Sequence, residues 1–120
     1  MPNWLLVALG SALGGVARYG VATLGVRWLG ASFPWGTLAV NVVGSGLIGW
    51  FVSTLSATPS RLFWITGICG GFTTFSAFSL ETFTLFRQGE FGRAALCLAA
   101  SLLLCGLSVA GGVLLGGRGR

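Results

Sequence analysis

The chain has 120 residues, of which 54% are hydrophobic and 8% are charged, and its mean hydropathy is +0.89. This composition predicts a membrane protein with no soluble domain and therefore argues against an enzyme. The net charge is +5 and comes from arginines scattered at the ends of apolar segments, which argues against a nucleic-acid-binding face.

Four stretches are long and apolar enough to cross a bilayer as a helix, which takes about 20 residues. They cover residues 4–26, 36–56, 62–85 and 93–116, so that residues 1–120 form a single membrane domain. The first stretch is too long for a cleaved signal peptide and lacks its basic start. Pro34 and Pro59 lie at predicted helix boundaries. The sequence therefore predicts an all-α integral membrane protein with four transmembrane helices.

The first two spans each contain a strongly polar side chain. Arg18 lies well inside the first span, where burial of its guanidinium costs roughly 2.5–3.5 kcal/mol, so it must face protein or water. It can attract an anion, cap helix carbonyls or snorkel to the interface, and a structural role with snorkelling is favoured. Asn41 lies early in the second span. Its amide needs partners, either across a helix interface or in a pore, and the sequence favours neither.

The third span contains the most informative segment of the chain, the polar run at 70–79. Two adjacent glycines, Gly70 and Gly71, and four hydroxyl residues stand in an otherwise apolar helix. We expect the third helix to be broken near its middle at the glycines, because half-helix ends inside a membrane are common ion sites. Phe75 and Phe78 share one face of the helix that follows. Glu81 is the only acid within a span, which makes it a candidate for proton coupling, although a structural bond near the helix end is favoured.

The fourth span contains three small polar side chains on one face, at the helical spacings of four and three residues. Ser101, Cys105 and Ser108 either form a polar track for an ion or bond back to their own helix carbonyls, and the second is the default. The cysteines show no CxxC spacing, so we expect packing roles rather than disulfides or metal ligands.

Small residues at a spacing of four predict close helix contacts. Gly10 with Gly14 and Gly112 with Gly116 form GxxxG pairs, and Gly106 with Ala110 is a weaker variant. The pattern does not indicate which helices meet.

The loop charges do not assign an orientation to the chain. With four spans, the N-terminus, residues 57–61 and the C-terminus share one side, which carries Arg61, Arg118 and Arg120. The other side carries Arg27, Arg87 and Arg93, partly offset by Glu90. This tie suggests a chain that inserts both ways and pairs with an inverted copy of itself. Alternatively, the loops carry too few charges to decide.

Three motifs occur in order along the chain, namely GGVARY at 14–19, GTLAVNVVG at 36–44 and GGFTTFS at 70–76. Together they resemble the Fluc (CrcB-type) fluoride channel family over nearly the whole length. The resemblance implies an antiparallel, dual-topology homodimer with two pores in the cell inner (plasma) membrane. Its implied function is passive export of cytoplasmic fluoride, which confers fluoride resistance. It also implies that the lipid bilayer, fluoride and a second copy are the partners, with no nucleic acid.

The same resemblance implies roles for individual residues. The backbone carbonyls of Gly70 and Thr73 from both copies would hold a structural Na⁺ at the dimer centre. The residues expected to line the pore are Asn41, Phe75, Phe78, Ser101 and Ser108. Structural or electrostatic roles fall to Arg18 and Glu81. Cys97 and Cys105 depart from the family pattern, which leaves the detailed pore lining of the fourth helix open.

Two other classes are weighed against the channel. A small dual-topology multidrug or guanidinium-type exporter would need an acid within the first span, where this chain has Arg18. A non-transporting membrane scaffold would explain the glycines but not the polar third span.

Overall fold

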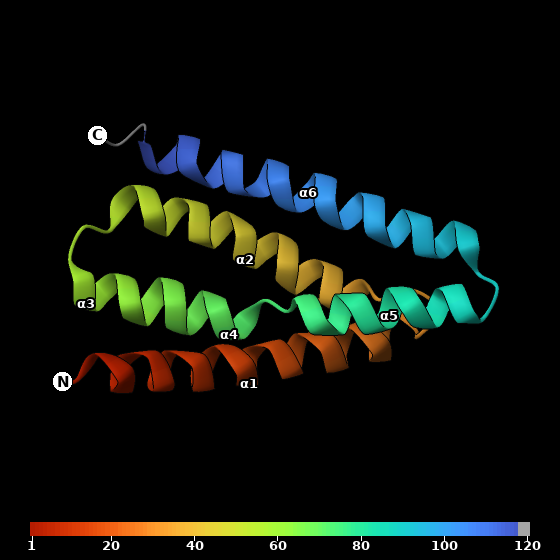
Figure 1. Cartoon of the computed structure of the whole chain (residues 1–120), viewed down its shortest axis with the longest axis horizontal. Coiled ribbons are helices and arrows are strands. Elements are labelled where there is room, and N and C mark those ends of the chain that lie inside the picture. The colour runs from red at the N-terminus through yellow and green to blue at the C-terminus, as the bar shows by residue number, and fades with distance from the viewer. Residues whose placement is uncertain (118–120) are drawn as a thin grey trace.

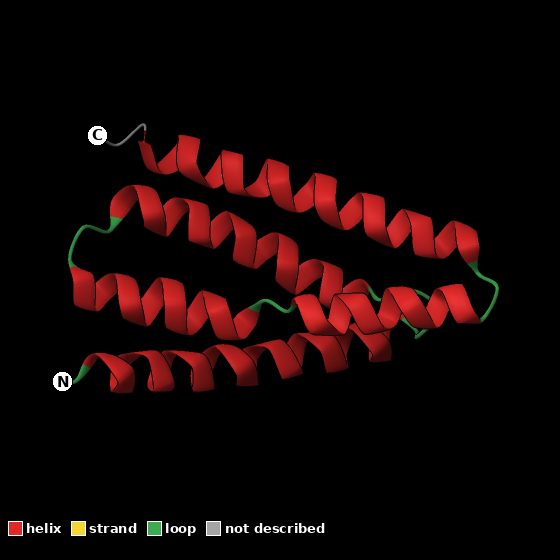
Figure 2. Cartoon of the chain, in the orientation of Figure 1, coloured by secondary structure: helices red, strands yellow, loops and turns green. Residues whose placement is uncertain are grey.

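The computed structural model describes residues 1–117, which are helical except for short connections (Figure 2). The elements are α1 (Asn3–Leu29), α2 (Trp35–Thr54), α3 (Thr58–Arg61), the π-helix η1 (Leu62–Cys69), α4 (Gly70–Phe72), α5 (Phe75–Arg87) and α6 (Phe91–Gly117). Four helical segments are long and apolar enough to cross a membrane: α1, α2, the third span Thr58–Arg87 and α6. Arg118 and Arg120, which enter the charge count above, lie outside the described residues.

The helices pack in two close pairs, as Figure 1 shows. α1 runs along η1 and α4 in the first half of the third span, and α2 runs along α6. α5 departs from α1 and packs against α6 instead. The N-terminus, the connection between α2 and α3, and the end of α6 lie at one end of the bundle (Figure 1).

Glycine produces the close contacts within each pair. A Cβ on Gly10 would lie 2.8 Å from the Gly67 Cα on η1, and a Cβ on Gly71 would lie 2.9 Å from the Ser11 Cα. On α6, a Cβ on Gly112 would lie 2.9 Å from the Trp50 amide nitrogen of α2. The first GxxxG pair therefore joins α1 to the third span and the second joins α6 to α2, whereas Gly106 has no neighbour at this range.

The third helix is interrupted at Thr73 and Thr74, not at the glycine pair where the sequence predicts the break. Gly70 is fully helical, with φ −62° and ψ −38°. The chain becomes extended only at Thr73 (ψ 156°) and Thr74 (φ −150°, ψ 119°) before α5 begins at Phe75. The prediction that the helix breaks at Gly70 and Gly71 is wrong. Gly71 has no side chain because α1 lies against its backbone, not because the chain bends there.

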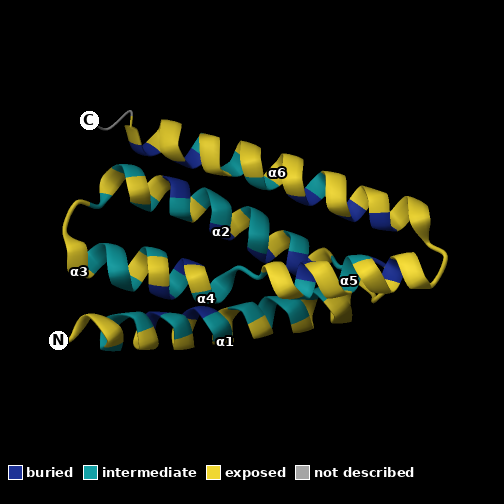
Figure 3. Cartoon of the chain, viewed as in Figure 1, coloured by how far each residue is buried: buried dark blue, intermediate teal, exposed yellow. Residues whose placement is uncertain are grey.

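Little of the single chain is buried, as the exposed outer faces in Figure 3 indicate. One apolar cluster lies where α5, α6 and the connection before α2 meet, and it consists of Phe33, Phe78, Leu85, Ala94 and Cys97. Large apolar side chains cover most of the remaining surface of all four spans. Such a surface is stable only against lipid or another protein.

Candidate functional site

The break in the third helix is held by a side chain from α2. The Thr74 amide donates to Asn41 Oδ1 at 2.8 Å, and Asn41 Nδ2 donates to the Thr74 carbonyl at 3.0 Å. In a regular helix the Thr74 amide would instead donate to the carbonyl of Gly70, four residues earlier. Asn41 therefore satisfies both backbone groups of an extended residue at a depth where water is scarce.

A second backbone amide near the break also donates to a side chain instead of to a helix carbonyl. Thr74 is the N-cap of α5, and its hydroxyl oxygen accepts from the Ala77 amide at 3.1 Å. In an unbroken helix that amide would donate to the carbonyl of Thr73. The amides that would bind the carbonyls of Gly70 and Thr73 in a regular helix thus donate to side-chain oxygens instead.

A third carbonyl is capped from the opposite side. Arg18 of α1 donates through Nε to the carbonyl of Gly71 at 3.2 Å, which agrees with the carbonyl-capping role among the three considered. Gly71 faces α1, whereas Gly70 and Thr73 line a pocket on the other side of the break. The arginine therefore leaves the pocket-facing carbonyls untouched.

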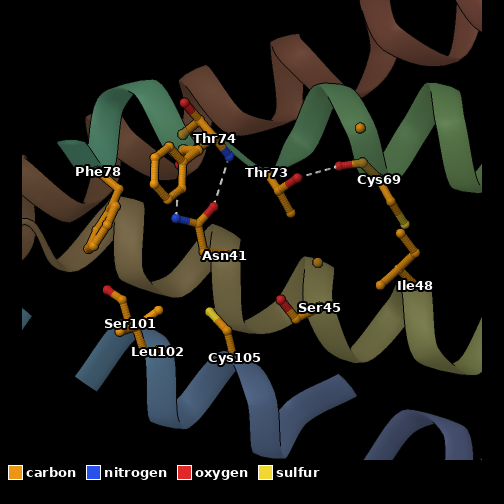
Figure 4. Close-up of a pocket in the computed structure, with 13 residues that line it drawn as sticks. Asn41, Ser45, Ile48, Cys69, Thr73, Thr74, Phe78, Ser101, Leu102 and Cys105 are labelled. Carbon is orange, nitrogen blue, oxygen red and sulfur yellow. Dashed lines mark hydrogen bonds between the residues drawn. The ribbon is translucent and has the colours of Figure 1, made fainter. Parts of the chain in front are cut away.

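That pocket has a volume of about 340 Å³ and lies between α2, the break and α6 (Figure 4). Asn41 and Ser45 approach from α2, and Ser101 and Cys105 approach from α6. The complete lining is Asn41, Gly44, Ser45, Ile48, Cys69, Gly70, Thr73, Thr74, Phe75, Phe78, Ser101, Leu102 and Cys105. No charged side chain belongs to this set within residues 1–117. The site is a mainly apolar cavity with a few neutral hydrogen-bonding groups.

The two phenylalanines of α5 line the pocket and contact each other. Their ring centroids lie 5.5 Å apart at an interplanar angle of 54°. Phe78 is 6% exposed and belongs to the apolar cluster, whereas Phe75 is 75% exposed. The pair therefore has one ring anchored in the chain and one standing on its open face. A second pocket of about 600 Å³ lies between α5 and α6 and shares these two rings in its lining. Phe83, Phe86 and Phe91 also line it.

The serines of the fourth span have different surroundings. Ser101 is buried and lines the pocket, and its hydroxyl has no hydrogen-bond partner within the described chain. Ser108 is not part of the pocket lining, and its hydroxyl donates to the Val42 carbonyl of α2 at 2.6 Å. Ser45 lines the pocket but escapes the sequence reasoning, although its spacing of four residues from Asn41 is a usable signal.

Glu81 lies away from the pocket, at the packing of α5 against the start of α2. Its Oε1 accepts from the buried Thr37 hydroxyl at 2.8 Å. Its Oε2 is buried without a hydrogen-bond partner within residues 1–117. The bond to Thr37 agrees with the structural role favoured for this acid, and the second oxygen retains acceptor capacity.

The three thiols are unpaired and lie in different surroundings. Cys97 is 2% exposed within the apolar cluster, where its Sγ accepts from the Thr82 hydroxyl at 3.5 Å. Cys69 is 1% exposed, and Cys105 is half-buried on the pocket wall. Of the two positions that depart from the family pattern, only Cys105 therefore lies on the pocket.

Comparison with known proteins gives matches along nearly the whole chain. Residues 5–113 match the family model described as CrcB-like protein, Camphor Resistance (CrcB). A protein of Opitutus terrae is 48% identical over 91% of this chain and 88% of its own length. A protein of Agrobacterium fabrum is 47% identical over 97% of both chains, and one of Nitrobacter winogradskyi is 50% identical over 83% of both. All three relatives carry the name fluoride-specific ion channel FluC.

Proposed function

The chain belongs to the CrcB-like family and is a fluoride-specific ion channel that confers fluoride resistance, and from that premise we propose a route for the anion and a site for a structural Na⁺. As a member of this channel family it is not an enzyme, and its four apolar helices agree with a multi-pass protein of the plasma membrane. Family membership also removes the exporter and scaffold alternatives raised by the sequence.

One observation carries the proposed route: the pocket beside the helix break combines neutral donors with the two phenylalanine rings. Fluoride is small and holds its hydration water tightly, so passage requires donors that replace this water. Ser101 and Ser45 have hydroxyls without partners in the described chain, and Asn41 has a second N–H beyond the one bound to Thr74. We assign these three groups to the anion path.

The phenylalanines fit an anion path through the distribution of charge in their rings. An aromatic edge carries partial positive charge, so rings presented edge-on attract an anion without the strong binding of a full charge. Conduction needs binding that is strong enough for entry and weak enough for exit. A lining without charged side chains meets that requirement, and the N-terminus of α5, at Phe75, adds a positive dipole end.

Ser108 takes a different place in this proposal from the one its helical spacing suggests. Its hydroxyl proton is already donated to the Val42 carbonyl, so it serves the packing of α6 on α2. Arg18 and Glu81 stabilise the break and the α2–α5 contact through their bonds to Gly71 and Thr37.

The proposed Na⁺ site uses the carbonyls of Gly70 and Thr73. Both residues line the pocket, and the amides that would normally satisfy their carbonyls are diverted to Asn41 and Thr74. Carbonyl oxygens at the C-terminal end of α4 suit a hard cation, since this is the negative end of a helix dipole. A bound Na⁺ would supply a fixed positive charge there.

Two carbonyls are too few ligands for a hard cation, so we propose that a second, inverted copy supplies two more. This copy would cover the open side of the pocket, where Gly70 and Phe75 are exposed. It would thereby close two equivalent anion paths, one for each copy. The near-balance of arginines at the two ends of the spans favours insertion in both orientations.

The proposed route can be tested with a natural thiol. Hg²⁺ replaces the thiol proton of cysteine, and a mercurated Cys105 would obstruct the pocket. Cys69 also lines the pocket, so the test uses chains that carry Cys69→Ser. We expect Hg²⁺ to remove most fluoride efflux from proteoliposomes containing the Cys69→Ser chain, and to leave efflux largely intact with the Cys69→Ser/Cys105→Ser chain.

The matched control is Cys97→Ser, because Cys97 lies outside the pocket and is almost fully buried. Added to Cys69→Ser, this substitution should leave efflux as sensitive to Hg²⁺ as in the Cys69→Ser chain. Equal block of the Cys69→Ser and Cys69→Ser/Cys105→Ser chains would remove Cys105 from the anion path.

A further inference from the structure

The geometry at the break indicates what keeps the third helix open. Thr73 and Thr74 are extended, yet neither is a glycine or a proline, and both can occupy helical backbone angles. The local sequence therefore does not forbid a continuous helix from Thr58 to Arg87. In that alternative the Thr74 amide would return to the Gly70 carbonyl.

Asn41 is the side chain that binds the Thr74 amide in place of the Gly70 carbonyl. It lies 33 residues away on α2, and its amide forms a two-bond clamp on the backbone of Thr74, at 2.8 Å and 3.0 Å. A backbone amide within a membrane must have a partner, and the clamp supplies one outside the third helix. Without it, re-formation of the helix would satisfy the Thr74 amide within the third span.

We propose that Asn41 is a positioning residue that holds the third helix open and so presents the Gly70 carbonyl to the cation. This inference rests on the proposed Na⁺ site and adds to it a dependence on a neighbouring helix. The same side chain would thus contact the anion through its remaining N–H and maintain the cation site through its other two bonds. A change in the α2–Thr74 contact would therefore affect both ions.

The Thr73-Thr74 pair allows the backbone to be observed directly. It is the only Thr-Thr pair in the chain, so threonine labelled with ¹³C and ¹⁵N gives a single interresidue carbonyl-to-nitrogen correlation in solid-state NMR. The carbon shifts connected through that correlation distinguish extended from helical backbone. The second readout is the shift in the midpoint of thermal unfolding when Na⁺ is replaced by N-methylglucamine.

Two substitutions of Asn41 test whether a hydrogen bond to the Thr74 amide is what keeps the helix open. Asn41→Leu has nearly the same size but no hydrogen-bonding group, so we expect helical shifts at both threonines and loss of the Na⁺-dependent midpoint shift. Asn41→Asp retains an oxygen that accepts from the Thr74 amide, so we expect extended shifts and a Na⁺ effect like that of the unaltered chain. Should Asn41→Leu not be recovered folded, Asn41→Ala makes the same test with a smaller side chain.

The matched control is Ser45→Ala, one helical turn along α2 and on the same pocket, with no bond to the break. It should keep both the extended shifts and the Na⁺ effect. Extended shifts together with an unchanged Na⁺ effect in Asn41→Leu would overturn the inference. Absence of any Na⁺ effect in the unaltered chain would overturn the proposed cation site, and the threonine shifts would still decide whether Asn41 holds the break.

Discussion

Replacement of Phe75 by isoleucine is expected to slow fluoride efflux by up to about tenfold while leaving the chain folded. Isoleucine keeps the apolar character but has no positively polarised ring edge. Edge-to-face aromatic pairs are worth about 0.5–1.5 kcal/mol, and we take the same range for an anion at a ring edge. A free energy of 1.4 kcal/mol corresponds to about a factor of ten. Because Phe75 is 75% exposed in the chain, little packing within the chain is lost. Efflux from proteoliposomes, measured with a fluoride electrode, gives the rate.

Phe78→Ile should reduce efflux similarly but also lower stability, because Phe78 is 6% exposed and packs in the apolar cluster. The control is Phe51→Ile on α2, whose ring packs against Trp64 and not on the pocket. Unaltered efflux in both Phe75→Ile and Phe78→Ile would contradict the aromatic role. A reduction as large in Phe51→Ile would show that the effect is not specific to the pocket.

The second large effect is expected at Gly14, where α1 meets the third span. An alanine Cβ would overlap the Ile68 carbonyl oxygen and lie 2.9 Å from the Phe72 amide nitrogen. Both neighbours are backbone atoms and cannot move without shifting the helix that leads into the break. We expect Gly14→Ala to cost about 1–3 kcal/mol or more in stability. The midpoint of thermal unfolding, followed by size-exclusion chromatography of the heated sample in detergent, measures the loss.

The neighbouring glycine supplies the control for this substitution. A Cβ on Gly15 would meet nothing within 4 Å in the chain, and alanine favours the helix more than glycine does. Gly15→Ala should therefore be as stable as the unaltered chain or more so. Equal destabilisation by the two substitutions would contradict the packing account of α1 against the third span.

The structure connects the two proposed ion sites through one interruption of a helix. α4 ends in carbonyls on the pocket side of the break, and α5 begins there with amides and the two phenylalanines. A broken helix therefore presents a negative end and a positive end within a few residues of each other. Arg18 donates to the Gly71 carbonyl from α1, whereas Gly70 and Thr73 line the pocket on the other side of the break.

The sequence supports the overall architecture because long apolar segments leave few alternatives. Four membrane helices follow from segment length and hydropathy, and Phe75 and Phe78 share a face as their spacing predicts. Family membership follows from three ordered motifs and is confirmed by the match over residues 5–113. In these respects local pattern and length were sufficient.

The details of the break could not be predicted because they depend on contacts between distant segments. Glycines 70 and 71 suggest a flexible point, but the extended residues are Thr73 and Thr74, and the backbone of Thr74 is hydrogen-bonded by Asn41 from another helix. The partner of Ser108 is likewise on α2 rather than on its own helix. The π-helical stretch Leu62–Cys69 also has no signature in the periodicity of the sequence. The break and the Ser108 bond both depend on contacts with α2.

The most direct test of the central claim is ion efflux from liposomes that contain only the purified chain. Internal fluoride or chloride is followed with an ion-selective electrode, and valinomycin with K⁺ dissipates the voltage that efflux builds up. A selective channel made from this chain alone predicts rapid, valinomycin-dependent loss of fluoride with retention of chloride. Fluoride loss that needs no valinomycin but follows a proton gradient, or no fluoride loss at all, would contradict it.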